Sequence, residues 1–212
     1  FDHGFLYGDG VYETIRSYGS RIFMRDQHLA RLRRSADAIG LAIPILEYRW
    51  PALLHEAMTR NDVGHERTDA YLRITISRGA GDIGLDPALC PTPTVVIMTK
   101  PLQAPPPQQY RTGVKLIVAK TRRNLPSALS PQIKATNFLN NILAKREAIA
   151  VGVAILLGGE YRIGADNGFD GLQGAAGRRG VDFGLGCHVS PGVSSWFQCT
   201  RGNSRARLRG RC

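Results

Sequence analysis

Alternating hydrophobic and polar positions predict two strands in the first half of the chain. Residues 71–78 (Tyr-Leu-Arg-Ile-Thr-Ile-Ser-Arg) alternate and are rich in β-formers, which is typical of a half-buried strand. Residues 94–98 predict its neighbour, joined to it by a loop that contains Gly and Pro. Residues 5–18 mix β-branched and aromatic residues with glycines, which predicts a turn followed by a third strand.

Helical spacing predicts two helices between these strands. Asp26 is a candidate N-cap for a helix that runs to about Ile39 and ends before Gly40. Its apolar positions recur on one face, at Leu29, Leu32, Ala36 and Ile39. A second helix is predicted over residues 45–60.

Four prolines within residues 101–107 exclude a helix or a central strand there, so we predict a linker over 101–110. Beyond it the pattern predicts a strand at 114–119, a loop, a helix that begins at Lys134, and a strand at 153–157. The prediction is therefore a mixed α/β (α+β) protein with two lobes. Residues 1–100 would form the smaller domain and 111–161 the beginning of a larger one.

The last part of the chain breaks this pattern. Residues 162–212 are rich in Gly, Arg, Ser and Cys and predict no clear element. This aberrant tail carries eight arginines, no lysine and three acidic residues, close to half of the net charge of +11. Because the positive charge is concentrated there, with no basic helix or zinc-finger spacing, we predict no nucleic-acid binding.

Composition limits the remaining classes of protein. The four cysteines lack a CxxC spacing, which favours neither a metal site nor a disulfide framework. No apolar run approaches transmembrane length and no signal peptide is visible, so we predict a soluble cytoplasmic protein without membrane partners.

Lys134 is the strongest candidate for chemistry. It precedes apolar residues at helical spacing and two adjacent asparagines, Asn140 and Asn141. An unprotonated amine among apolar neighbours is what a carbonyl-bearing cofactor needs to form a Schiff base. Taken alone, the pattern also fits a solvated lysine near a helix start.

Three separated strings resemble the fold-type IV pyridoxal-phosphate enzymes. They are residues 1–16 (FDHGFLYGDGVYETIR), 28–35 (HLARLRRS) and 133–148 (IKATNFLNNILAKREA). The family contains branched-chain aminotransferases, D-amino-acid aminotransferases and aminodeoxychorismate lyases. The resemblance covers residues 1–161 and implies a two-lobed fold, with pyridoxal 5'-phosphate between the lobes, and a homodimer.

The resemblance also implies cofactor-binding residues. Lys134 matches the lysine that holds the cofactor and then moves a proton at the substrate α-carbon. Arg31, in the pattern His-x-x-Arg-Leu, matches the arginine that grips the cofactor phosphate, a task that suits a guanidinium. A surface arginine on an amphipathic helix is the alternative. We expect His28 to serve packing or a hydrogen bond.

Substrate-binding residues follow from the same resemblance. Tyr7 and Tyr12 match an aromatic wall around an aliphatic side chain, and residues 78–87 look most like the prokaryotic branched-chain enzymes. Tyr71 and Arg73 match a strand pair at the same pocket, where the arginine receives the distal carboxylate of glutamate or 2-oxoglutarate. Ordinary strand residues are the alternative for this pair.

After Tyr161 the resemblance stops. The family continues with Val-(Ser or Ala)-Glu, whose glutamate meets the pyridine nitrogen, but Gly164 stands at that position here. Arg-Ile-Gly at 162–164 can be encoded CGT ATC GGA G, and one base later this reads Val-Ser-Glu. We therefore predict a frame shift near codon 162, with a divergent Gly-rich terminus as the alternative. The family's preceding segment would also make this chain a fragment at its N-terminus.

The resemblance implies transamination of Leu, Ile or Val with 2-oxoglutarate, so the partners are a small amino acid and a 2-oxo acid. D-amino-acid aminotransferase and aminodeoxychorismate lyase are alternatives within the fold. A catalytically dead chain that only dimerises or misfolds is the alternative of another class.

Overall fold

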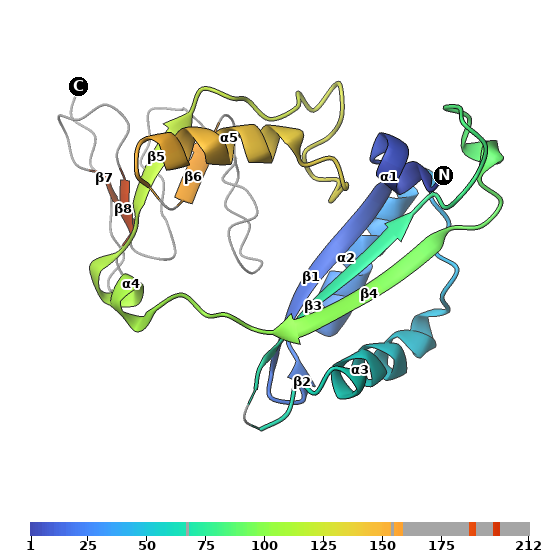
Figure 1. Cartoon of the computed structure of the whole chain (residues 1–212), viewed down its shortest axis with the longest axis horizontal. Coiled ribbons are helices and arrows are strands. Elements are labelled where there is room, and N and C mark those ends of the chain that lie inside the picture. Colours follow the sequence, from blue (N-terminus) through green and yellow to red (C-terminus); the bar gives the residue numbers. More distant parts are fainter. Residues whose placement is uncertain (67, 154, 159–186, 190–196, 200–212) are drawn as a thin grey trace. The chain divides into compact units, whose positions relative to one another are not determined.

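The chain forms two compact units (Figure 1). The computed structural model describes residues 1–66, 68–153, 155–158, 187–189 and 197–199. Unit 1 comprises Phe1–Ala104 and Pro126–Asn137, and unit 2 comprises Pro105–Leu125 and Phe138–Cys212. The chain therefore leaves unit 1 at Ala104, within the predicted linker. It returns to unit 1 for Pro126–Asn137, and the residues that follow belong to unit 2.

Unit 1 is built on a four-stranded antiparallel sheet with the strand order β2-β1-β3-β4. Its strands are β1 (Gly10–Tyr18), β2 (Arg21–Ile22), β3 (Ala70–Ser77) and β4 (Thr94–Pro101). Its helices are α1 (His3–Tyr7), α2 (Arg25–Asp37) and α3 (Trp50–Arg60), with short 3-10 turns at Glu47–Arg49 and Pro87–Leu89. Each strand predicted in this part of the sequence is thus present, and α1 occupies part of the expected turn.

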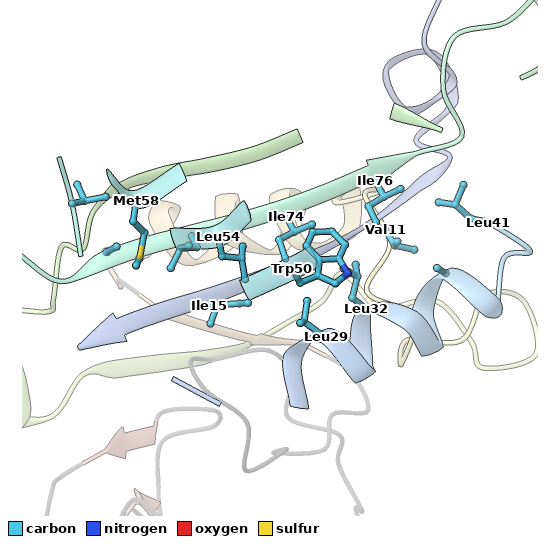
Figure 2. Close-up of a cluster of buried hydrophobic side chains, with 14 residues drawn as sticks. Val11, Ile15, Leu29, Leu32, Leu41, Trp50, Leu54, Met58, Ile74 and Ile76 are labelled. Atoms are coloured by element: carbon cyan, nitrogen blue, oxygen red, sulfur yellow. The ribbon is translucent and has the colours of Figure 1, made fainter. Parts of the chain in front are cut away.

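The core of unit 1 lies between one face of this sheet and helices α2 and α3. Figure 2 shows Leu29 and Leu32 of α2 beside Val11, Ile15 and Ile74 of the sheet. The cluster continues with the buried residues Ala36, Leu41, Trp50, Leu54, Met58, Val63, Ala70, Leu72 and Ile76. Each fully buried aliphatic side chain contributes about 1.5–3 kcal/mol, so this face holds the unit together.

Helix α2 begins two residues earlier than predicted. Its N-cap is Met24, whose φ of 48° lies in the left-handed region, and Asp26 lies in the first turn without capping the helix. There the Asp26 carboxylate accepts a hydrogen bond from Arg25 and faces the positive end of the helix dipole. The predicted apolar stripe is confirmed, because Leu29 and Leu32 are buried.

Among its described residues, unit 2 contains a second four-stranded sheet in the order β6-β5-β8-β7. Its elements are α4 (Pro107–Thr112), β5 (Lys115–Ala119), α5 (Leu139–Ala150), β6 (Ile155–Gly158), β7 (Cys187–Val189) and β8 (Phe197–Cys199). Strands β5 and β6 are parallel, and the other pairs are antiparallel.

Two predictions for the later sequence need comment. Strands β7 and β8 lie in the tail for which no element was predicted, because three residues are too few for a periodic pattern. The predicted frame shift at 162–164 lies outside the described residues. Among the helices that the structure describes, none combines the length and apolar character needed to cross a membrane.

Candidate active site

Lys134 lies in an extended segment between β1 and α2. Its carbonyl oxygen accepts a hydrogen bond from the Tyr12 N–H at 2.9 Å, and its own N–H donates to Ser35 Oγ at 3.1 Å. A β-bridge joins Val11 to Ala135 beside it. The prediction that Lys134 begins a helix is therefore wrong. The backbone of residues 134–136 pairs with β1 instead, and α5 begins only at Leu139.

The side chain of Lys134 is directed onto Tyr12. Its Nζ donates to the Tyr12 hydroxyl at 3.1 Å and lies 4.3 Å from the centre of the ring. The lysine is 9% exposed and the tyrosine 7%. The guanidinium of Arg73 lies 4.2 Å from the same ring, an arrangement that favours cations. Three residues predicted for the site thus meet within unit 1.

Arg31 contacts a buried carboxylate that the sequence analysis did not single out. Glu13, which is fully buried, accepts hydrogen bonds from Arg31 Nε at 2.5 Å and Nη2 at 3.0 Å. Its Oε2 also lies 2.7 Å from His28 Nδ1. An ionised carboxylate can only accept, so the His28 tautomer assigned from this contact carries its hydrogen on Nδ1. His28 therefore has the hydrogen-bonding role expected of it.

Glu13 is held in its ionised form. Burial would raise its pKa, but hydrogen bonds from His28 and Arg31, together with the charges of Arg31 and Lys134, outweigh burial and lower it below the ordinary value of 4.5. A buried carboxylate stays charged inside a protein when hydrogen-bond donors and positive charges surround it, as they do here.

Arg31 and its partner Glu13 lie close to Lys134 in the structure. Arg31 and Ser35 are four residues apart on α2, which places them on the same face of the helix. Ser35 binds the backbone of Lys134, whereas Arg31 binds Glu13, the residue that follows Tyr12 in β1. Helix α2 therefore connects the guanidinium and the amine through two neighbouring turns.

The remaining predicted residues contact other parts of unit 1. The Tyr7 hydroxyl accepts a hydrogen bond from Gly84 N at 3.2 Å, and its ring meets His3 edge to face. Tyr71 lies on β3 beneath the Lys100 ammonium, 5.3 Å from the ring centre. It shares a sheet face with Arg73, two positions along the same strand. Neither tyrosine forms a polar or ring contact with Lys134 among the described residues.

The chain matches a family model, amino-transferase class IV, over residues 10–160. It belongs to the class IV aminotransferase family, whose members depend on pyridoxal phosphate. The matched region contains β1, α2, Arg73 and Lys134, and so includes Tyr12 and the two cationic residues that contact it.

Similar proteins within this family carry different names. A provisionally named branched-chain-amino-acid aminotransferase of Methanocaldococcus jannaschii is 39% identical over 153 residues, which are 72% of this chain and 51% of that protein. An aminodeoxychorismate lyase of Bacillus subtilis is 33% identical over 147 residues, 69% of this chain and 48% of the lyase. The chain spans about half the length of the curated relatives it matches.

Solved structures agree with this assignment of the fold. The branched-chain amino acid aminotransferase of Escherichia coli has a TM-score of 0.65 and 25% identity, over 72% of this chain and 51% of that structure. Another branched-chain amino acid aminotransferase, crystallised with pyridoxamine 5'-phosphate, has a TM-score of 0.67 and 27% identity. That match covers 74% of this chain and 52% of the other structure. The chain thus has the mixed α/β fold of the fold-type IV aminotransferases, as predicted.

Proposed function

We propose that this protein transfers an amino group between a branched-chain amino acid and 2-oxoglutarate with pyridoxal 5'-phosphate. The observation that carries the proposal is the Lys134 amine, which is nearly buried and hydrogen-bonded to Tyr12, with the Arg73 guanidinium on the same ring. The relative with 39% identity and both solved structures are named for branched-chain substrates, which supports this choice within the family.

The residues present fit the chemistry of the cofactor. An aldehyde requires a primary amine, which Lys134 supplies, and a phosphate dianion requires cationic donors in a fixed geometry, which Arg31 supplies. When bound, pyridoxal phosphate supplies a carbonyl carbon for the amine and a ring that withdraws electrons from the substrate α-carbon.

The protein's own residues would then divide the work. Lys134 binds the cofactor and moves a proton at the substrate α-carbon, and the Tyr12 hydroxyl holds its Nζ in one direction by accepting a hydrogen bond. Arg31 binds the cofactor phosphate. Arg73 receives the distal carboxylate of 2-oxoglutarate, while the rings of Tyr12, Tyr7 and Tyr71 provide apolar contacts for an aliphatic substrate. The homodimer implied by the family resemblance stays a prediction, which analytical ultracentrifugation would test.

The experiment is chemical trapping of the cofactor. The purified chain is mixed with pyridoxal phosphate, its visible absorbance is recorded, and borohydride reduction is followed by peptide mapping. We expect a reduced adduct on Lys134, which is retained when the exposed Lys145 is changed to Arg. A folded protein without an adduct, or with one on another lysine only, would contradict the proposal.

Substrate class is tested with the frame restored. Where codons 162–164 read CGT ATC GGA and the next codon begins with G, deleting the first base of codon 162 continues the sequence Tyr-Val-Ser-Glu and supplies the predicted carboxylate for the pyridine nitrogen. We expect that protein to convert L-leucine with 2-oxoglutarate faster than D-alanine with the same acceptor. Preference for D-alanine, or conversion of aminodeoxychorismate, would assign one of the alternative activities named in the family.

A further inference from the structure

Glu13 is the one acidic side chain that is buried among the residues the structure describes. The proposed function assigns roles to Lys134, Arg31, Tyr12 and Arg73, but none to this carboxylate. Removing a carboxylate from water carries a large desolvation penalty, which close cationic partners offset only when the geometry is good. The position therefore needs an explanation other than packing.

The geometry of the ion pair supplies one. Glu13 Oε1 faces Arg31 Nε, and Oε2 faces Arg31 Nη2 at 3.0 Å. Two parallel N–H···O bonds fix both the plane of a guanidinium and its rotation about the side-chain axis. An arginine held by a single contact keeps that freedom and loses it only on binding a ligand.

Glu13 is itself held from two directions. Its backbone belongs to β1, where it pairs with Ile74 of β3. Its second oxygen contacts His28, which is 4% exposed and lies one helical turn before Arg31. The carboxylate therefore transmits the rigidity of the sheet to a side chain that extends from a helix and is 20% exposed.

We infer that Glu13 is a positioning residue, which holds the Arg31 guanidinium in the orientation that binds the cofactor phosphate. This inference rests on the proposed function, because it takes Arg31 as the phosphate ligand. Glu13 does not contact the phosphate itself: an anion next to an anion would be repelled. It acts by orienting the cation between them.

Positioning by Glu13 and its negative charge have opposite effects on phosphate binding. Changing Glu13 to Gln removes a negative charge, so electrostatics alone would strengthen the binding of a phosphate dianion. Loss of the bidentate pair leaves Arg31 without its fixed plane, so positioning predicts weaker phosphate binding. The direction of the change thus separates the two explanations.

The experiment compares two ligands that differ only in the phosphate. Pyridoxal phosphate and pyridoxal are titrated into the wild-type chain and into Glu13→Gln, with visible absorbance as the measure of binding. We expect the affinity ratio, phosphate ligand over pyridoxal, to fall by about tenfold or more, while pyridoxal affinity changes by less than about twofold. Glu56→Gln, which breaks an exposed pair with Arg60, is the matched control.

A second background shows whether Glu13 acts through Arg31. In Arg31→Ala the ratio should already be low, and adding Glu13→Gln should lower it no further, as expected for two residues that act as a unit. An unchanged or increased ratio in the single variant would overturn the inference. So would an equal further loss in the Arg31→Ala background.

Failure of the inference is distinguishable from failure of the proposed function. If the wild-type chain binds neither ligand at Lys134, the proposed function fails. If it binds both and Glu13→Gln keeps the wild-type ratio, only the inference fails. Should Glu13→Gln not fold, Glu13→Asp takes its place. It keeps the charge and withdraws the carboxylate by one methylene, so a wild-type ratio in this folded variant overturns the inference.

Discussion

The two faces of β1 differ in what their side chains meet. Val11 and Ile15 lie in the cluster of core side chains (Figure 2) and are almost fully buried, and Glu13 between them contacts Arg31 and His28. The opposite face presents Tyr12, which contacts Lys134 and Arg73. Consecutive residues of one strand thus serve the core and the reactive amine separately, because side chains alternate across a sheet.

One strand thus holds both of the groups that we propose to bind the cofactor, Arg31 through Glu13 and Lys134 through Tyr12. On the core face, packing makes Glu13 rigid enough to orient a cation. On the other face, Tyr12 holds the amine of Lys134, and the backbone of the same residue binds the Lys134 carbonyl. The separation between the Arg31 guanidinium and the Lys134 amine, which we propose to bind the cofactor phosphate and carbonyl, is then set by the spacing of β1 and α2.

The largest effect is expected on the Tyr12 face. Lys134→Ala should abolish the borohydride adduct and lower transamination in the frame-restored protein by several orders of magnitude, because it removes the amine that contacts Tyr12. The backbone bonds of residue 134 remain, so the midpoint of thermal unfolding should change little. Loss of folding together with the adduct would show that the two faces are not separable.

On the core face, Ile74→Ala should lower the free energy of unfolding by about 2–5 kcal/mol, because it leaves a cavity beneath α2 and α3. Thr14→Ala, on the opposite face of the sheet, should change it by less than about 0.5 kcal/mol. Urea unfolding followed by the fluorescence of Trp50, in a Trp196→Phe background, measures both. Equal losses would contradict the division of the sheet into two faces.

Acid should weaken the core face through Glu13. Its pKa is lowered in the folded state, so its contribution is present above the ordinary value of 4.5 and is lost as pH falls through the folded pKa. The free energy of unfolding of the wild-type chain should therefore decline below pH 4.5. Glu13→Gln, measured by urea unfolding at a series of pH values, should show a shallower decline. Parallel curves would mean that the pair with Arg31 is not formed in solution.

The smallest effect is expected where α2 meets the lysine segment. Ser35→Ala removes the acceptor of the Lys134 N–H and should lower the free energy of unfolding by about 1 kcal/mol. Hydrogen exchange at that amide should become faster, while the amide of Tyr12 keeps its protection. Ser130→Ala, whose hydroxyl accepts from the exposed Gln132, is the control. Unchanged exchange at Lys134 would contradict the observed contact.

Local pattern was sufficient for the strands of unit 1 and for the buried stripe of α2, because periodicity reports directly which face is apolar. It failed at Lys134, where apolar residues at helical spacing follow a segment that pairs with β1 instead. It also passed over Glu13. A glutamate in a strand has no local feature that marks it as buried, and its partners His28 and Arg31 come 15 and 18 positions later.

The contact between Lys134 and Tyr12 joins residues 122 positions apart. During synthesis the four strands of unit 1 are complete once residue 104 has been made. The edge of β1 beside Gly10 is paired only after residues 126–137 have also been made. Because closing so long a loop costs entropy before its contacts stabilise the fold, we expect this contact to form late in folding. A chain released before residue 134 would therefore contain the sheet but lack the Lys134 amine that Tyr12 holds. The proposed reaction with an aldehyde would become possible only when the fold is nearly complete.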